Sequence, residues 1–403
     1  MKRVFTVALL AIVLSVPLVA DKAEAGAKIK INDEASIDLG FRLQSLYLST
    51  DSDLDGDGDF ERLDDFLVRR ARFRLGGKVN DEVSIFLQTD FSQGAGSGGD
   101  VRLIDAFLKY APSKALSFII GENMAPVTRQ NLTSSGGLMA VDRPGITYKN
   151  LTWGTRALST FSTATYGDSD AGLRGDVDVR DLGITLFGST SYSDSLHLKY
   201  YLGVYDGIQK ADKDSERIAG RVQLNLYDAE PGYYGLSTYL GKKKTIGIGA
   251  AFDTQNDVAD DLATGTTVDY TMFTGDIFAD LPMGTGALTL EAAYLDLDLE
   301  GATQLDNGTT VVDANQSQGN GYYIQAGYYT GNWQPWIEFE DWDADASNNK
   351  GSYDSTRLGL TYFIEGHNAN VKVGYESFQA DADIDGTNED TIKTYVVGFY
   401  VTY

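Results

Sequence analysis

Apolar and polar residues alternate along most of the chain, and no long stretch shows a helical period. The clearest example is the run TYVVGFYVTY at residues 394–403. Its apolar side chains fall on one face when it is read at a period of two: Tyr395, Val397, Phe399, Val401 and Tyr403. Because successive side chains of a strand point to opposite faces, this pattern predicts a β-strand with one apolar and one polar face.

Runs of this kind recur throughout the chain and predict sixteen strands. The predicted ranges are 36–48, 65–79, 82–92, 101–111, 115–122, 180–189, 195–206, 215–227, 244–253, 268–279, 286–296, 320–330, 334–342, 353–364, 369–379 and 390–403. The sixth range has the least distinct pattern, and residues 145–165 are the alternative for its place.

The connections between these ranges alternate in length. Short turns such as APSKA, LPMGTG and GHNAN follow the even strands, with the longer 228–244 as an exception. Long acidic or glycine-rich connections mostly follow the odd strands, and the longest is 123–179. Such sorting is typical of outer-membrane barrels and has no reason to occur in a sandwich or a propeller. We therefore expect an all-β protein that folds as a transmembrane antiparallel β-barrel of about sixteen strands.

Targeting signals and composition support this class. The chain begins with MKR, an apolar run over 4–20 and the small-residue site AEA at 23–25, which predicts a signal peptide over 1–25 and a barrel over 26–403. Cleavage after Ala20 and a retained helical anchor are the alternatives. We expect the protein in the outer membrane of a Gram-negative bacterium, although an aromatic content of 11% without cysteine also fits a secreted all-β protein.

The net charge and the absence of cysteine exclude several classes. A formal charge of −25 excludes a general affinity for nucleic acid, which requires a basic surface. Without cysteine there is neither a disulfide framework nor a cysteine metal site.

Arginines stand on what should be the inner face of several strands. In FLVRRARFRL at residues 66–75, Phe73 and Leu75 face lipid only if Arg70, Arg72 and Arg74 face inward. The opposite register would place arginine in hydrocarbon at about 2–4 kcal/mol each near the midplane. The same reasoning turns four more arginines inward: Arg42, Arg217, Arg221 and Arg357. A row of guanidinium groups in a narrow channel attracts anions, so we expect an anion path.

An alternative explanation of the arginines is charge balance. The same register turns Glu291, Glu338 and Glu340 inward, on strands expected nearly opposite the arginines of 36–48 and 65–79. This opposing acidic wall would make a transverse field that selects neither sign strongly. The two interpretations, an anion path and a balanced wall, both fit the sequence.

Several segments resemble the phosphate-selective porin O and P family. They are FLVRRARFRLGGKVNDEVSIFLQTDF (66–91), IDAFLKYAPSKALSFIIGENMAPVT (104–128), DRPG (142–145), DLGITLFG (181–188) and LKYYLGVYDG (198–207). The resemblance implies a homotrimeric porin of sixteen strands whose long third loop folds into the lumen, with arginines along the lumen and basic residues at the constriction. Arg143 matches the arginine that follows the third loop in this family and joins the arginines expected for the anion path. Connection 123–179 is poor in lysine, unlike strongly phosphate-selective members, so anion preference is better supported than phosphate selectivity.

The acidic stretch DSDLDGDGDFE at residues 51–61 resembles the first half of a calcium loop. Its alternate carboxylates precede a turn, as oxygen ligands do in such loops: Asp51, Asp53, Asp55 and Asp57. A calcium loop closes with a bidentate acidic residue at its twelfth position. Counted from Asp51, the twelfth residue here is Arg62, so this ligand is missing. The alternative is a solvated loop that binds divalent ions loosely and bridges lipopolysaccharide phosphates.

These observations predict a channel without catalysis or a required cofactor. Its partners would be outer-membrane lipid, lipopolysaccharide and small hydrophilic solutes, with anions favoured. The alternatives are a weakly cation-selective general porin and a barrel that acts as sheath or receptor for a partner protein. A hydrolase would need a base for its nucleophile, and His197 is the only candidate that faces the lumen.

Overall fold

The computed structural model describes residues 26–52, 61–91, 101–147, 180–208, 210, 215–306, 308, 311–313, 318–345, 351–381 and 391–403. Among them, no helix combines the length and hydropathy that a membrane-spanning helix requires.

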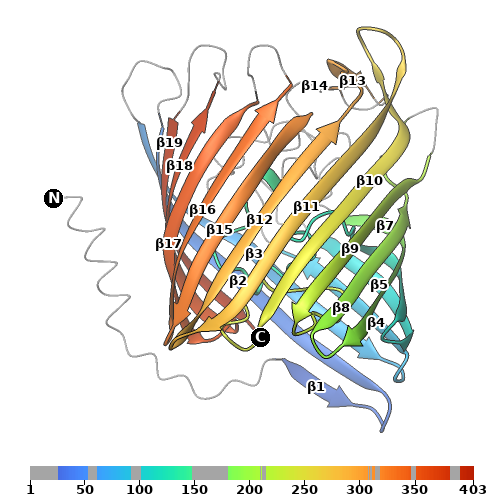
Figure 1. The fold of residues 1–403 in the computed structure, drawn as a ribbon, viewed down its shortest axis with the longest axis vertical. Coiled ribbons are helices and arrows are strands. Elements are labelled where there is room, and N and C mark those ends of the chain that lie inside the picture. The colour runs from blue at the N-terminus through green and yellow to red at the C-terminus, as the bar shows by residue number, and fades with distance from the viewer. Residues whose placement is uncertain are drawn as a thin grey trace, which may run out of the picture.

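Sixteen long strands form one closed antiparallel barrel (Figure 1). They are β2 (Ser36–Ser52), β3 (Glu61–Lys78), β4 (Val83–Asp90), β5 (Arg102–Ser113), β6 (Leu116–Met124), β7 (Arg180–Ser193), β8 (Leu196–Tyr205), β9 (Arg217–Tyr227), β10 (Thr245–Asp261), β11 (Thr267–Met283), β12 (Gly286–Asp298), β15 (Gly319–Thr330), β16 (Trp333–Ala344), β17 (Tyr353–Glu365), β18 (Ala369–Ala380) and β19 (Thr391–Thr402). The ring closes where β19 pairs with β2. The predicted strand number is confirmed, and β7 occupies the sixth place.

Three short strands lie at the rims. β1 (Ala27–Lys30) pairs with the start of β2 at the rim of the short turns, called here the short-turn rim. β13 (Gln304–Asp306) and β14 (Val311–Asp313) form a hairpin at the opposite, long-loop rim (Figure 1). In outer-membrane barrels the short turns lie on the periplasmic side.

Several strands extend further than their apolar pattern predicts. β10 continues to Asp261 through the polar sequence TQNDVADD, and its ladder with β11 persists beyond a bulge after Gln255. Outside hydrocarbon there is no apolar face to maintain, whereas backbone hydrogen bonds still favour pairing. The apolar alternation therefore marks the membrane-facing part of a strand rather than its full length.

Each strand separates an apolar outer face from a buried inner face. Outward residues such as Ile277 and Ile337 are 48% and 52% exposed, whereas their inward neighbours are buried. Part of the burial comes from connecting segments that pack on the inner wall. Met139 and Val141 of the β6–β7 connection join an apolar cluster with Trp336. Much of the inner wall is therefore covered by the chain itself.

The outer face predicts how stability depends on membrane depth. Ile277→Arg, near the middle of β11, should lower the free energy of unfolding by about 2–4 kcal/mol because it places a charge near the bilayer midplane. Met283→Arg, on the same face at the strand end, should cost only about 0–1 kcal/mol. Denaturant unfolding in lipid vesicles measures both, and equal costs would contradict the proposed lipid face.

Candidate functional site inside the barrel

Arginines of β2 and β3 lie side by side on the inner face. Arg42 is the Cα partner of Arg72, and Arg70 is the partner of Gln44. These three arginines are buried, with at most 6% of each residue exposed. Like charges directly opposite each other in a ladder are destabilising. Groups that bind or neutralise the guanidiniums are therefore needed nearby.

Carboxylates supply this neutralisation for two of the three. Nε of Arg72 donates to Oδ2 of Asp90 at 2.7 Å. Nη2 of Arg70 donates to Oδ1 of Asp142 at 2.9 Å, and Nη1 donates to Gln44 at 2.7 Å. Arg74 lies nearer the short-turn rim, where it donates to the carbonyl oxygen of Tyr403 at 3.1 Å.

A bulge adds Arg69 to this group. The β2–β3 ladder pairs Gln44 with Arg70 and Ser45 with Val68, so Arg69 is the extra residue on β3. Its Nε donates to Oδ2 of Asp142 at 2.7 Å. Strict alternation would have placed Arg69 on the lipid face, which is why sequence reasoning missed it. Two adjacent arginines in an otherwise alternating strand were the available signal.

Arg42 differs from its neighbours because its hydrogen-bond partners carry no charge. Its Nη1 donates to Oγ of Ser135 at 2.5 Å, and Nη2 donates to Oγ of Ser134 at 3.3 Å. Nε is buried and has no hydrogen-bond partner in the described part of the chain. Among the described residues, no carboxylate lies within ion-pair distance of this guanidinium. Arg42 therefore keeps its positive charge uncompensated by direct contact.

The segment 125–147 holds Asp142 and both serines against the inner wall. Burial alone would raise the pKa of Asp142, but the guanidiniums of Arg69, Arg70 and Arg143 outweigh burial and hold it well below its ordinary value. Arg143 itself donates to the backbone of this segment, at 2.9 Å to the carbonyl of Gln130. The rest of the connection, 148–179, lies outside the described residues, so its folding into the lumen stays a prediction.

Arg357 lies within the predicted acidic wall. It lies beside the acidic residues of β16 and β18, 2.7 Å from Glu338, 3.1 Å from Glu340 and 2.7 Å from Glu376. All four side chains are at most 2% exposed. Glu338 and Glu340, predicted for the acidic wall, therefore form one ion cluster with Arg357.

Arg217 and Arg221 of β9 are also paired locally. Arg217 lies 2.5 Å from Asp253 and 3.0 Å from Asp181, whereas Arg221 lies 2.5 Å from Asp276. Five of the eight arginines predicted for the anion path thus meet a carboxylate of another strand or of segment 125–147: Arg70, Arg72, Arg217, Arg221 and Arg357. This favours the balanced wall for these positions.

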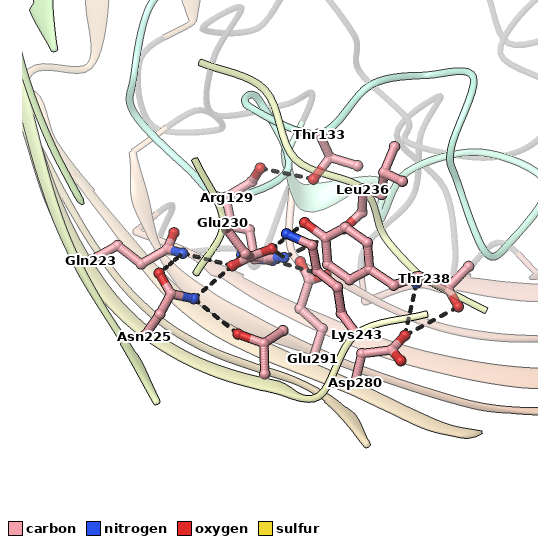
Figure 2. A network of polar contacts seen from close by, with 12 residues as sticks. Arg129, Thr133, Gln223, Asn225, Glu230, Leu236, Thr238, Lys243, Asp280 and Glu291 are labelled. Carbon is pink, nitrogen blue, oxygen red and sulfur yellow. Dashed lines mark hydrogen bonds and ion pairs between the residues drawn. The ribbon is translucent and has the colours of Figure 1, made fainter. Parts of the chain in front are cut away.

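Sequence reasoning also missed a buried polar network around Glu230 and Arg129 (Figure 2). Both oxygens of Glu230 accept from Arg129, at 2.8 and 3.0 Å. Glu291, predicted for the acidic wall, lies 3.8 Å from Arg129 and accepts from Gln130 at 2.8 Å. The network joins the segment 125–147 to the connection 228–244.

A family model described as phosphate-selective porin O and P matches residues 39–399, nearly the whole chain. The chain belongs to this family. An uncharacterised protein of Aquifex aeolicus (strain VF5) is 23% identical to this porin over 412 aligned residues, which cover 93% of this chain and 87% of the relative. The resemblance found in the sequence is therefore confirmed.

Solved structures share the fold of this porin at low sequence identity. An anion-selective porin from Comamonas acidovorans aligns with 92% of this chain and 100% of its own, with a TM-score of 0.59 and 12% identity. OmpF of Salmonella typhi, in complex with daunomycin, aligns with 94% and 100%, with a TM-score of 0.54 and 15% identity. A trimer form of OmpT from Vibrio cholerae aligns with 92% and 100%, with a TM-score of 0.50 and 14% identity.

Family and fold together indicate an outer-membrane channel rather than an enzyme. His197, the candidate base, lies at the β7–β8 turn of the porin. Its Nε2 donates to the carbonyl oxygen of Tyr227 at 2.7 Å, which leaves Nδ1 to accept from Ser191 at 2.7 Å. This pair links the turn to the end of β9.

The predicted calcium site stays a prediction. Asp51 lies near the end of β2 as the Cα partner of Arg62. The other three aspartates, Asp53, Asp55 and Asp57, lie outside the described residues of the porin. Elsewhere in the described part of the chain, no group of three or more histidine, aspartate or glutamate residues is placed to hold a metal ion.

Asp142 should make the stability of this porin depend on pH. At neutral pH, Asp142→Asn should lower the free energy of unfolding by about 3–5 kcal/mol, because it removes the buried carboxylate that Arg69 and Arg70 share. The folded-state pKa of Asp142 is depressed. Its stabilisation is therefore complete above the unfolded pKa of about 3.9 and is lost as pH falls toward the folded value.

Denaturant unfolding in vesicles at a series of pH values measures this effect. The difference between wild type and Asp142→Asn should shrink as the pH is lowered below about 4. Asp64→Asn is the control, since Asp64 forms an exposed pair with Arg62 and should cost at most about 1 kcal/mol. A difference that is independent of pH would contradict the role of the carboxylate charge.

Proposed function

We propose that this porin lets small hydrophilic solutes diffuse passively across the outer membrane and favours small anions, with Arg42 as the residue that carries the preference. The supporting observation is that the guanidinium of Arg42 binds the hydroxyls of Ser134 and Ser135, which neutralise no charge. The charge of a paired arginine is largely neutralised by its own carboxylate. An anion in the lumen is therefore attracted more strongly by Arg42 than by the paired arginines.

The surroundings of Arg42 strengthen its attraction for anions. The positive charges of Arg70, Arg72, Arg74 and Arg143 all act on it. In a site with low-dielectric walls such a potential is focused rather than screened by bulk water. Arg70 and Arg72 therefore contribute to the field at Arg42 even though each is paired with a carboxylate.

The mechanism would be exchange of hydration for protein donors. Guanidinium forks suit the oxygens of phosphate and carboxylate, and the two serine hydroxyls can donate as well as accept. Passage requires binding strong enough for entry and weak enough for release. Phosphate belongs to this class of anions, but connection 123–179 supplies few lysines, so we propose a general anion preference.

Connection 123–179 would form the constriction beside this site. Support comes from its described part, which contacts opposite walls of the barrel. Val127 accepts from Thr274 of β11 at 2.8 Å, and Ser135 binds Arg42 of β2. β2 and β11 are the first and tenth of the sixteen barrel strands, so they lie across the lumen from each other.

Selectivity in planar bilayers tests the proposal. Under a KCl gradient the wild-type reversal potential should favour chloride. Arg42→Gln should lower the chloride-to-potassium permeability ratio by roughly twofold or more, because it removes an uncompensated charge from the pore. Arg62→Gln, which changes an exposed arginine paired with Asp64, should leave the ratio near that of wild type.

The other outcomes separate the competing functions. A wild-type potential that favours potassium would indicate a cation-selective general porin. Folded protein without conductance would indicate a sheath or receptor for a partner protein. A chloride preference that Arg42→Gln leaves intact would remove Arg42 from the anion path.

We further propose that the protein is a homotrimer exported with removal of residues 1–25. The family and the trimer form of the Vibrio cholerae OmpT, which has the same fold, support the assembly. The expected result is a particle of three chains, each beginning at Gly26, when the purified detergent complex is analysed by native mass spectrometry. A monomeric particle at all protein concentrations would contradict the trimer.

A further inference from the structure

The connection between β9 and β10 does not form a tight turn like its neighbours at the short-turn rim. Residues 228–244 instead contact the inner faces of distant strands. The hydroxyl of Tyr233 donates to the carbonyl of Met124 of β6 at 2.6 Å. At the other end of the segment, Gln334 of β16 donates to Thr238 at 3.2 Å.

These contacts place the segment across the lumen. β6 and β16 are the fifth and thirteenth of the sixteen barrel strands, which are opposite positions in the closed ring. The backbone between Tyr233 and Thr238 must therefore bridge the interior. Asp280 of β11 fixes the far end by accepting from the backbone N–H of Tyr239 at 2.8 Å, and His367 donates to the carbonyl of Thr238 at 2.9 Å.

This segment meets residues 125–147, which enter from the long-loop rim. The N–H of Gly235 donates to the carbonyl of Leu132 at 2.7 Å, and the N–H of Ser134 donates to Gly235 at 3.0 Å. A third bond joins Ser237 to Gly137 at 3.0 Å. Thr133 and Gly235 form an isolated parallel bridge. Two connections from opposite rims thus share backbone hydrogen bonds inside the barrel.

The ion pair between Arg129 and Glu230 fastens the two segments together (Figure 2). Besides accepting both bonds from Arg129, Glu230 accepts from Gln223 at 2.7 Å and Asn225 at 2.9 Å, both on β9. The guanidinium of Arg129 lies 3.6 Å from the ring centroid of Phe278. Burial would raise the pKa of Glu230, but Arg129 outweighs burial and holds it well below its ordinary value.

We infer that residues 228–244 form a second constriction of the pore, held against segment 125–147 by the Arg129–Glu230 pair, and that they set the size of solute that passes. A backbone that bridges the lumen reduces its open cross-section, and pore diameter limits which solutes pass. The tight packing of both segments on the wall makes the constriction part of the resting channel. This inference rests on the proposed channel function and adds the size limit.

A reversible cross-link tests the inference within one protein. Thr133→Cys and Gly235→Cys would place two thiols at the bridge between the segments, and the natural chain has no cysteine to compete. A Cβ at Gly235 would meet its nearest atoms at 3.7 Å, which is ordinary contact. Glu230→Gln is added to weaken the ion pair between Arg129 and Glu230. The readouts are single-channel conductance and liposome swelling with neutral sugars of increasing size.

The reduced triple variant should show a conductance roughly twofold or more above wild type and admit larger sugars, because the constriction is loosened. Oxidation should return both properties toward wild type. Lys242→Gln, an exposed change in the same segment, is the matched control and should behave like wild type.

Two results would overturn the inference. One is a disulfide that fails to form in folded protein, since the two segments would then not be neighbours. The other is conductance and size limit that are equal in the oxidised and reduced states. Neutral sugars report size alone, so loss of anion preference in the reversal potential would count against the proposed function and leave this inference standing.

Discussion

Backbone hydrogen bonding in the absence of water is the constraint on which the whole structure depends. Within hydrocarbon an unpaired N–H or C=O group costs several kcal/mol, so a sheet that spans the membrane must have no free edge. The β19–β2 ladder meets this requirement by pairing Tyr47 with Val397 and its neighbours along both strands. Once the ring is closed, every strand has one face in lipid and one face toward the interior. The position of each arginine follows from that division.

The interior then has its own requirement, which is charge compensation. Burying a guanidinium without a partner is costly, and the structure answers mostly with local pairs, as at Arg357 and Arg217. Arg42 is the departure, since two serine hydroxyls replace the expected carboxylate. A buried guanidinium without a carboxylate partner is easier to explain by a function of the residue than by a contribution to stability. In the proposed mechanism the surrounding pairs keep the wall rigid, and the uncompensated charge of Arg42 gives the channel its preference for anions.

Much of the fold could be predicted from the sequence, because alternation reports directly which residues meet lipid. It located sixteen strands and turned Arg42, Arg70 and Arg72 inward. It could not assign ion-pair partners, since the period of a strand fixes the face of a residue but not its height relative to the next strand. The contact of Glu338 and Glu340 with Arg357 was therefore not predicted, although all three residues were correctly turned inward.

Irregular backbone limited the prediction of the site. The bulge that turns Arg69 inward breaks the alternation on which the prediction relied. The inward course of 228–244 depends on contacts with Leu132 and Gly137, far away in the sequence. Its unusual length among short turns was the one local signal.

The seam between β2 and β19 has a consequence for how the protein reaches its folded state. These strands are the first and last of the ring, so nearly the whole described chain separates the residues that they bring together. Pairings between such distant residues close large loops and form slowly. Until they form, β2 and β19 expose edges that can pair with other molecules. During assembly, ring closure therefore competes with aggregation. The free edges of β2 and β19 must be protected in the cell until the two strands pair.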